Sequence, residues 1–216
     1  MTVDRSADHA MRFAEALGSF QDRSERLVGW IQLAIIAVFA ALYFASPPAL
    51  DASHAGFHPV PVALAFYTLF TIFKQIQAYR RSLPGWLISL SILIDMALLF
   101  ALIWSFHLQY NQPPAFYLKA PTLLYVFIFI ALRALRLEVF YVLLAGGLAV
   151  IGLLLLATYS ATGTYDLLCA TTRDYVVYLT SPRILWGAEI DRIHPSVIVA
   201  GVLAVPVSPR QPLPPP

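Results

Sequence analysis

The chain has 216 residues, of which 59% are hydrophobic and 12% charged, whereas an ordinary soluble domain carries about a quarter charged residues. A net charge of +2 is too small to indicate a nucleic-acid-binding surface, and Cys169 is the single cysteine, which excludes an intrachain disulfide. Composition therefore excludes a soluble globular domain. It predicts an all-α polytopic membrane helix bundle, with five clear transmembrane helices and a truncated sixth.

Residues 1–27 are polar and carry charges of both signs, which predicts a cytoplasmic amphipathic N-terminal segment. Phe13, Leu17 and Phe20 recur at helical spacing and would share one face of a helix. We expect this helix to lie on the inner leaflet of the membrane. A helix that binds a protein partner would show the same pattern.

About 20 apolar residues, rising 1.5 Å each, cross the hydrocarbon core of a bilayer. Read against that length, the predicted spans are residues 28–46, 60–73, 86–108, 116–132 and 139–159. Residues 160–193 are polar enough to form an extracytoplasmic segment. A partial sixth span at 195–205 precedes a proline-rich tail, 206–216, where we expect Pro206 and Pro209 to break the helix.

The lysines and arginines near the ends of these spans predict the orientation of the chain. With the N-terminus inside, nine lie on the cytoplasmic side: Arg5, Arg12, Arg23, Arg26, Lys74, Arg80, Arg81, Arg133 and Arg136. Four lie outside: Lys119, Arg173, Arg183 and Arg192. Because cytoplasmic loops are enriched in basic residues, we expect a multi-pass protein of the bacterial inner membrane with its N-terminus in the cytoplasm.

Asp95 lies near the middle of the third predicted span. An isolated carboxylate costs about 2.5 to 3.5 kcal/mol at the bilayer centre, so Asp95 should face the interior of the bundle. Lys74, at the end of the preceding antiparallel span, is the expected partner because its long side chain can reach inward. A pair that fixes helix packing is the favoured interpretation; a proton or ion relay is the alternative.

Arg133, Arg136 and Glu138 form the turn between the fourth and fifth predicted spans. One interpretation makes this turn a contact for a cytosolic domain. The other is topological, with both arginines extending to lipid phosphates.

The fifth predicted span has a face of small side chains suited to close helix contact: Ala145, Gly146, Gly147, Ala149 and Gly152. Small residues at this spacing are common in apolar helices, so the pattern is a weak signal.

Three histidines could approach one another on the outer side, together with Asp51. They are His54, His58 and His107. Gly56 and Pro59 disfavour a regular helix that would align the first two, so we expect loop histidines and no metal site.

Two stretches resemble a known family: FIFIALRALRLEVFYVLLAGGLAVIG, residues 127–152, and DYVVYLTSPRILWGAEIDRIH, residues 174–194. They are similar to the N-terminal six-helix membrane domain that precedes the catalytic domain in a group of bacterial class III adenylate/guanylate cyclases. Residues 93–127 resemble the middle of the same domain. The resemblance ends at about His194.

The resemblance implies a membrane-anchoring module that senses a stimulus and holds two catalytic domains together as a homodimer in cyclic nucleotide signalling. The family's catalytic domain uses ATP with Mg²⁺ or Mn²⁺. No catalytic, cofactor-binding or metal-binding residue of that domain has a counterpart here, so we expect a truncated, catalytically inactive chain without cofactors. A small transporter or channel subunit using Asp95 and Lys74, and a stand-alone membrane receptor, are the alternatives. Lipid is the expected environment, and nucleic acid is not an expected partner.

Overall fold

The structure is a computed structural model that describes residues 2–45, 59–81, 83–109, 113–162 and 171–207. Its helices follow one another along the chain as α1 (Thr2–Ala45), α2 (Pro59–Arg80), α3 (Gly85–Gln109), the 3₁₀ helices η2 (Pro114–Lys119) and η3 (Pro121–Leu124), α4 (Tyr125–Ala134), α5 (Val139–Thr162), α6 (Tyr175–Thr180) and α7 (Trp186–Val207). The predicted all-α architecture is confirmed over these residues.

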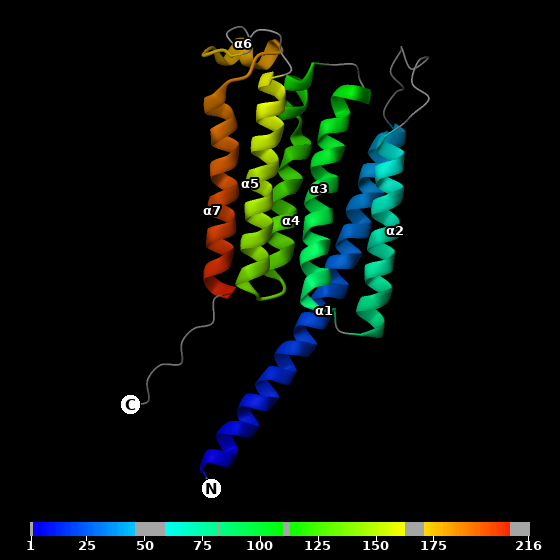
Figure 1. The fold of residues 1–216 in the computed structure, drawn as a ribbon, viewed down its shortest axis with the longest axis vertical. Coiled ribbons are helices and arrows are strands. Elements are labelled where there is room, and N and C mark those ends of the chain that lie inside the picture. Colours follow the sequence, from blue (N-terminus) through cyan, green and yellow to red (C-terminus); the bar gives the residue numbers. More distant parts are fainter. Residues whose placement is uncertain (1, 46–58, 82, 110–112, 163–170, 208–216) are drawn as a thin grey trace.

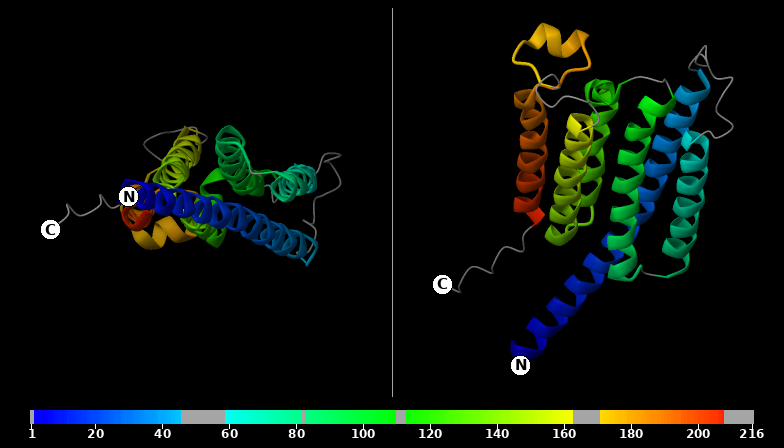
Figure 2. Two further views of the ribbon diagram at one scale, coloured as in Figure 1. Left: turned by 90° about the horizontal axis from the view of Figure 1, so that it is seen from below. Right: turned by 45° about the horizontal axis from the view of Figure 1, so that its top comes forward.

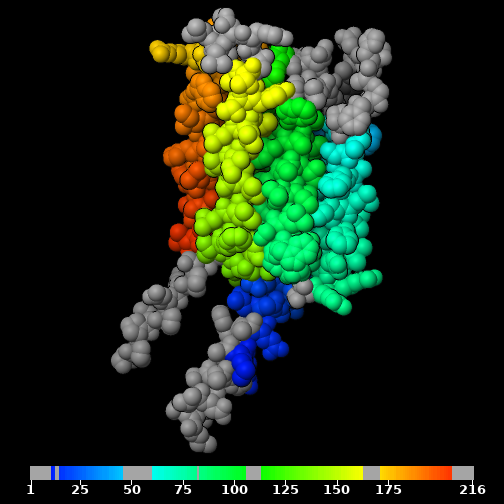
Figure 3. Space-filling model, viewed as in Figure 1, coloured from blue at the N-terminus to red at the C-terminus, as the bar shows by residue number. Residues whose placement is uncertain are grey.

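The long helices stand side by side as one bundle (Figure 1). α1 packs on α2, α2 on α3, and α3 on α5, while α4, α5 and α7 contact one another. The space-filling view shows α3 and α5 next to each other on one face, with α2 at its edge (Figure 3). The bundle has two ends, which we call the Arg136 end, after the turn between α4 and α5, and the Lys119 end, where η2 and α6 lie.

By length and composition, four helices of the part of the chain that the structure describes are able to cross a membrane: Glu15–Ala45, Val60–Arg80, Gly85–Ser105 and Val139–Thr162. They carry many exposed large apolar side chains, such as Phe66, Leu93 and Leu155. Apolar surface on that scale needs a lipid solvent rather than water. A multi-pass membrane protein is therefore the state that fits this chain.

The predicted span 116–132 is not one continuous α-helix. The tight turns of η2 and η3 each begin at a proline, Pro114 and Pro121, and α4 starts only at Tyr125. Proline lacks the N–H that would continue an α-helical ladder, so these residues divide the segment. Of the five predicted spans, this one is therefore divided, and the apolar helix that ends at Ala134 has fewer than 18 residues.

α1 is a single helix from Thr2 to Ala45, whereas the sequence suggested a separate segment before residue 28. No proline interrupts it, and Gly29 has a packing role: a Cβ there would lie 1.8 Å from Gln75 Oε1 on α2. The N-terminal part of α1 extends beyond the bundle at the Arg136 end (Figures 1 and 2).

α7 begins at Trp186 and continues to Val207, so it is longer than the predicted partial span 195–205. Pro206 lies within its last turn, where the absence of an N–H removes one hydrogen bond only. Residues 186–193, which were predicted to belong to the extracytoplasmic segment, form the first part of α7. α7 is thus longer than predicted, but it ends one residue after Pro206 and is not among the described helices that are long and apolar enough to cross a membrane.

The small-residue face of α5 serves close helix contacts at two of its glycines. A Cβ at Gly146 would lie 2.4 Å from the Cβ of Ala200 on α7, and one at Gly152 would lie 2.1 Å from the Phe100 ring on α3. Gly147 has open space instead. The predicted face is thus confirmed at Gly146 and Gly152 but not at Gly147.

Candidate functional site

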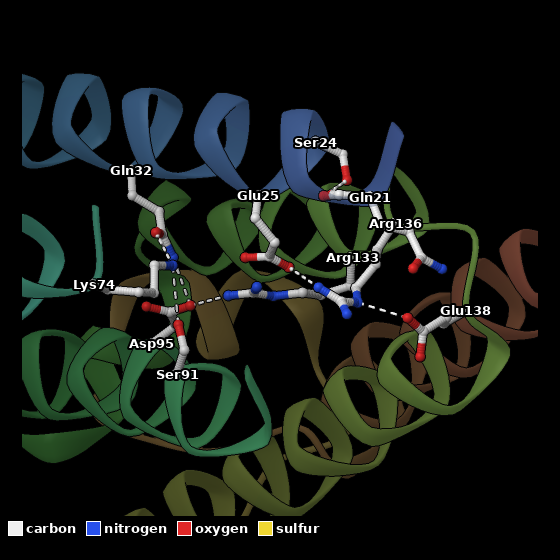
Figure 4. A network of polar contacts seen from close by, with 10 residues as sticks. All are labelled: Gln21, Ser24, Glu25, Gln32, Lys74, Ser91, Asp95, Arg133, Arg136 and Glu138. Atoms are coloured by element: carbon white, nitrogen blue, oxygen red, sulfur yellow. Dashed lines mark hydrogen bonds and ion pairs between the residues drawn. The ribbon is translucent and has the colours of Figure 1, made fainter. Parts of the chain in front are cut away.

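Asp95, in the middle of α3, is 2% exposed and lies at the centre of a buried polar network. Its Oδ2 accepts a hydrogen bond from Gln32 Nε2 of α1 at 2.6 Å and forms an ion pair with Arg133 Nη2 of α4 (Figure 4). A carboxylate in an apolar bundle needs such partners because its desolvation is costly. The prediction that Asp95 faces the interior is confirmed.

Lys74 belongs to the same network, but Gln32 lies between it and Asp95. The ammonium group donates to Gln32 Oε1 at 2.6 Å and to Ser91 Oγ at 3.0 Å. Gln32 therefore accepts from the cation with its carbonyl oxygen and donates to the anion with its amide nitrogen, as an amide side chain can. Lys74 and Asp95 are therefore bridged by the Gln32 side chain, and the expected direct pair is not formed.

Arg133 is only 3% exposed, and its guanidinium points into the bundle. The two sequence interpretations placed it at a cytosolic contact or at lipid phosphates, and the structure corrects both. The reason is electrostatic: Asp95 is a buried anion, and an arginine one helix away neutralises it with a charge-assisted hydrogen bond.

Arg136 and Glu138 stay at the turn, where Arg136 connects two parts of the chain. Its Nε donates to Glu138 Oε1 at 2.7 Å, and its Nη1 lies 3.3 Å from Glu25 Oε1 of α1. Between them, Leu137 has a φ of 60°, a left-handed conformation that costs a side-chain-bearing residue energy. The turn is therefore held in one geometry against α1.

Three members of the network keep a buried polar atom with no hydrogen bond to the protein: Glu25 Oε2, Asp95 Oδ1 and Arg133 Nη1. Buried polar atoms are nearly always paired with protein or with ordered water. These atoms are the points at which the network can accept a further polar partner.

The sequence interpretation missed Gln32, Ser91 and Glu25, although their spacing carried a signal. Glu25 and Gln32 are seven residues apart, and Ser91 and Asp95 are four apart, so each pair shares a helix face. Polar residues repeating at one-turn or two-turn spacing inside an apolar segment indicate a helix face that is turned toward the bundle interior.

A second charged cluster lies at the Lys119 end. Tyr178 of α6 donates to Glu189 Oε1 at 3.0 Å, and Arg192 Nη1 lies 3.1 Å from each carboxylate oxygen of Glu189. Lys119 donates to the Ser181 carbonyl at 2.7 Å, with its ammonium 4.8 Å from the Tyr178 ring. Burial, reinforced by the charge of Glu189, raises the pKa of Tyr178 to about 12, so it remains a hydrogen-bond donor at neutral pH.

Neither cluster is a metal centre: within residues 2–45, 59–81, 83–109, 113–162 and 171–207, no three metal-ligating side chains converge. Asp51, His54 and His58, and the side chain of His107, lie outside the part of the chain that the structure describes. Comparison of the chain with family models, with curated proteins and with solved structures gives no significant match.

Proposed function

We propose that this chain is a membrane-anchoring and sensory module of the kind that precedes the catalytic domain of bacterial class III adenylate/guanylate cyclases. The finer identity depends on the sequence resemblance of residues 127–152 and 174–194. The coarser role, a helical module that carries a change of packing from one side of a membrane to the other, depends on the geometry below.

The observation that carries the proposal is the location of three features at the Arg136 end. The N-terminal part of α1, the turn between α4 and α5, and the C-terminal end of α7 all lie there (Figure 1). A catalytic domain attached after α7 would thus lie on the same side as the turn and α1. Basic residues gather at this end, which favours the cytoplasm.

The ion pairs give this end a physical link to the bundle interior. Glu25 of α1 contacts Arg136, and Arg136 is three residues from Arg133, which contacts Asp95 of α3. A rotation of α4 that changes the Asp95 contact would therefore also shift the turn that contacts α1. We expect the active form to be a homodimer in the bacterial inner membrane, because class III catalytic sites form between two chains.

Cysteine labelling in intact cells tests the orientation with two matched variants on a Cys169→Ala background. Arg183 and Arg81 are both exposed, one at each end of the bundle. A membrane-impermeant maleimide should label Arg183→Cys in intact cells and Arg81→Cys only after permeabilisation. The reverse pattern would overturn the cytoplasmic location of the Arg136 end.

The cyclase role is tested by joining the whole chain to a class III catalytic domain. Membranes with the chain alone should form no cyclic AMP from ATP and Mn²⁺, whereas membranes with the fusion should form it. Arg136→Gln in the fusion should change the rate, while Arg80→Gln at an exposed position should not. Equal rates for Arg136→Gln and the parent fusion, or turnover by the chain alone, would overturn the proposal.

A second candidate function is a transporter or channel subunit with Asp95 and Lys74 in a polar path. The buried polar atoms of Glu25, Asp95 and Arg133 that lack a hydrogen bond to the protein favour it, because buried polar atoms of this kind commonly bind water. Proton or cation flux into vesicles loaded with the purified chain, abolished by Asp95→Asn, would support this function. Vesicles that remain as tight as empty ones would rule it out.

A further inference from the structure

A cavity of about 220 Å³ lies at the Lys119 end, between the η2–η3–α4 segment and α7. Its polar lining comes from Lys119, Arg192 and Ser196, and its apolar lining includes Leu123, Phe127 and Leu153. These residues are distant in the sequence and meet only because α7 packs against α4 and α5.

The charge around the cavity is unbalanced. Lys119 and Arg192 line it, and no carboxylate of the described residues is in the lining; Glu189 contacts Arg192 from outside it. Arg192 makes both of its contacts to Glu189 through Nη1, and its guanidinium has five N–H donors in all. Lys119 likewise gives one of its three N–H groups to the Ser181 carbonyl. The lining therefore has two cations, one of them paired with Glu189, and further N–H donors.

The volume of this partly open cavity indicates the size of ligand that fits inside it. A protein cavity of about 150 Å³ holds one benzene molecule, and drug-sized pockets begin at about 300 Å³. A cavity of about 220 Å³ has room for an apolar group of benzene size plus one anionic group. The apolar wall formed by Leu123, Phe127 and Leu153 suits the first part, and the two cations suit the second.

We propose that this cavity binds a small amphipathic anion, such as a six-carbon or aromatic carboxylate, with the anionic group between Lys119 and Arg192 and the apolar group against Leu123 and Phe127. The ligand would connect η2, which precedes α4, to α7. Its role as the sensed stimulus rests on the proposed function; its binding does not, because binding is measured on the chain alone.

The probes are hexanoate and benzoate, added to the purified full chain in phosphatidylcholine nanodiscs. Calorimetry should detect saturable binding of both, with hexanol and acetate much weaker, since each lacks one half of the recognised chemistry. Charge-assisted hydrogen bonds contribute about 1.5 to 3 kcal/mol, so Arg192→Gln or Lys119→Met should weaken hexanoate about tenfold to a hundredfold.

Matched controls separate binding from folding. Arg183→Gln, at an exposed arginine of the same end, should leave hexanoate affinity unchanged, and Arg192→Lys should retain most of it. The comparison of hexanoate with hexanol uses the unaltered chain, so it stands even where a variant is unstable. Equal binding of hexanoate and hexanol, or no binding of hexanoate, would overturn the proposal.

A lipid phosphate could supply the same anion. Nanodiscs that also contain phosphatidylglycerol should leave hexanoate binding intact if the site takes a small soluble ligand. Loss of hexanoate binding in those discs, with phosphatidylglycerol retained by the parent chain but not by Arg192→Gln, would assign the site to a lipid and overturn the small-ligand proposal.

Discussion

Arg133 of α4 forms its ion pair with Asp95 of α3 in the interior of the bundle, 38 residues away along the chain. Both side chains are almost fully buried. The attraction between two buried charges compensates for their desolvation, so the loss of either partner is far more costly than the loss of both.

Removal of one partner of this pair should destabilise the bundle strongly. Asp95→Leu or Arg133→Leu leaves a buried charge without its counter-ion, and we expect each to lower the free energy of unfolding by about 3 to 5 kcal/mol. Reversible unfolding of the purified chain in mixed detergent micelles measures this quantity.

The double variant Asp95→Leu/Arg133→Leu should lose much less than the sum of the two single losses. Asp191→Leu, at an exposed carboxylate of α7, is the matched control and should change stability little. Strictly additive losses would show that the two charges do not stabilise each other.

Gln32 should be essential to the hydrogen-bonded bridge between Lys74 and Asp95. Gln32→Leu deletes a hydrogen bond to each charged group, and such bonds contribute about 1.5 to 3 kcal/mol apiece. We expect the unfolding free energy to fall by at least about 2 kcal/mol. Gln77→Leu, at a half-buried position of α2, serves as control. Similar stabilities for Gln32→Leu and Gln77→Leu would argue against a stabilising role of the Gln32 bridge.

A methyl group should be tolerated at Gly147 of α5 but not at its neighbour Gly146, which contacts α7. Gly146→Ala places a Cβ against Ala200, and overpacking of this kind costs about 1 to 3 kcal/mol. Gly147→Ala meets open space and gains helix propensity, so it should be neutral or stabilising. Thermal unfolding checks whether Gly146→Ala lowers the unfolding temperature while Gly147→Ala leaves it unchanged or raises it.

Arg136 should hold the turn between α4 and α5 against α1. Arg136→Gln removes both ion pairs, to Glu25 and to Glu138, so amide hydrogen exchange in residues 135–139 should accelerate. Because Arg136 is 13% exposed, global stability should change less than it does for Arg133→Leu. Unchanged exchange would mean that the conformation of the turn does not depend on these ion pairs.

Much of the architecture could be predicted from the sequence because apolar length is a local property. The runs that became α3 and α5 were predicted at a length that crosses a membrane, whereas the run for α2 was predicted only as 60–73 and the helix continues to Arg80. Helix ends were less predictable. The sixth span was predicted to begin at residue 195 and to break at Pro206 and Pro209, yet α7 runs from Trp186 to Val207, because a packed helix can lose single backbone hydrogen bonds and persist.

The sequence by itself determined that Asp95 faces the interior, since a carboxylate inside an apolar span has no favourable place against lipid. Only the tertiary structure decided its partners. Periodicity defines which residues share a face of one helix, but not which helices are neighbours or how each is rotated. Those depend on close contacts such as Gly146 with Ala200 and Gly29 with Gln75. They bring Arg133 and Gln32 to Asp95, and they keep Lys74 one side chain away.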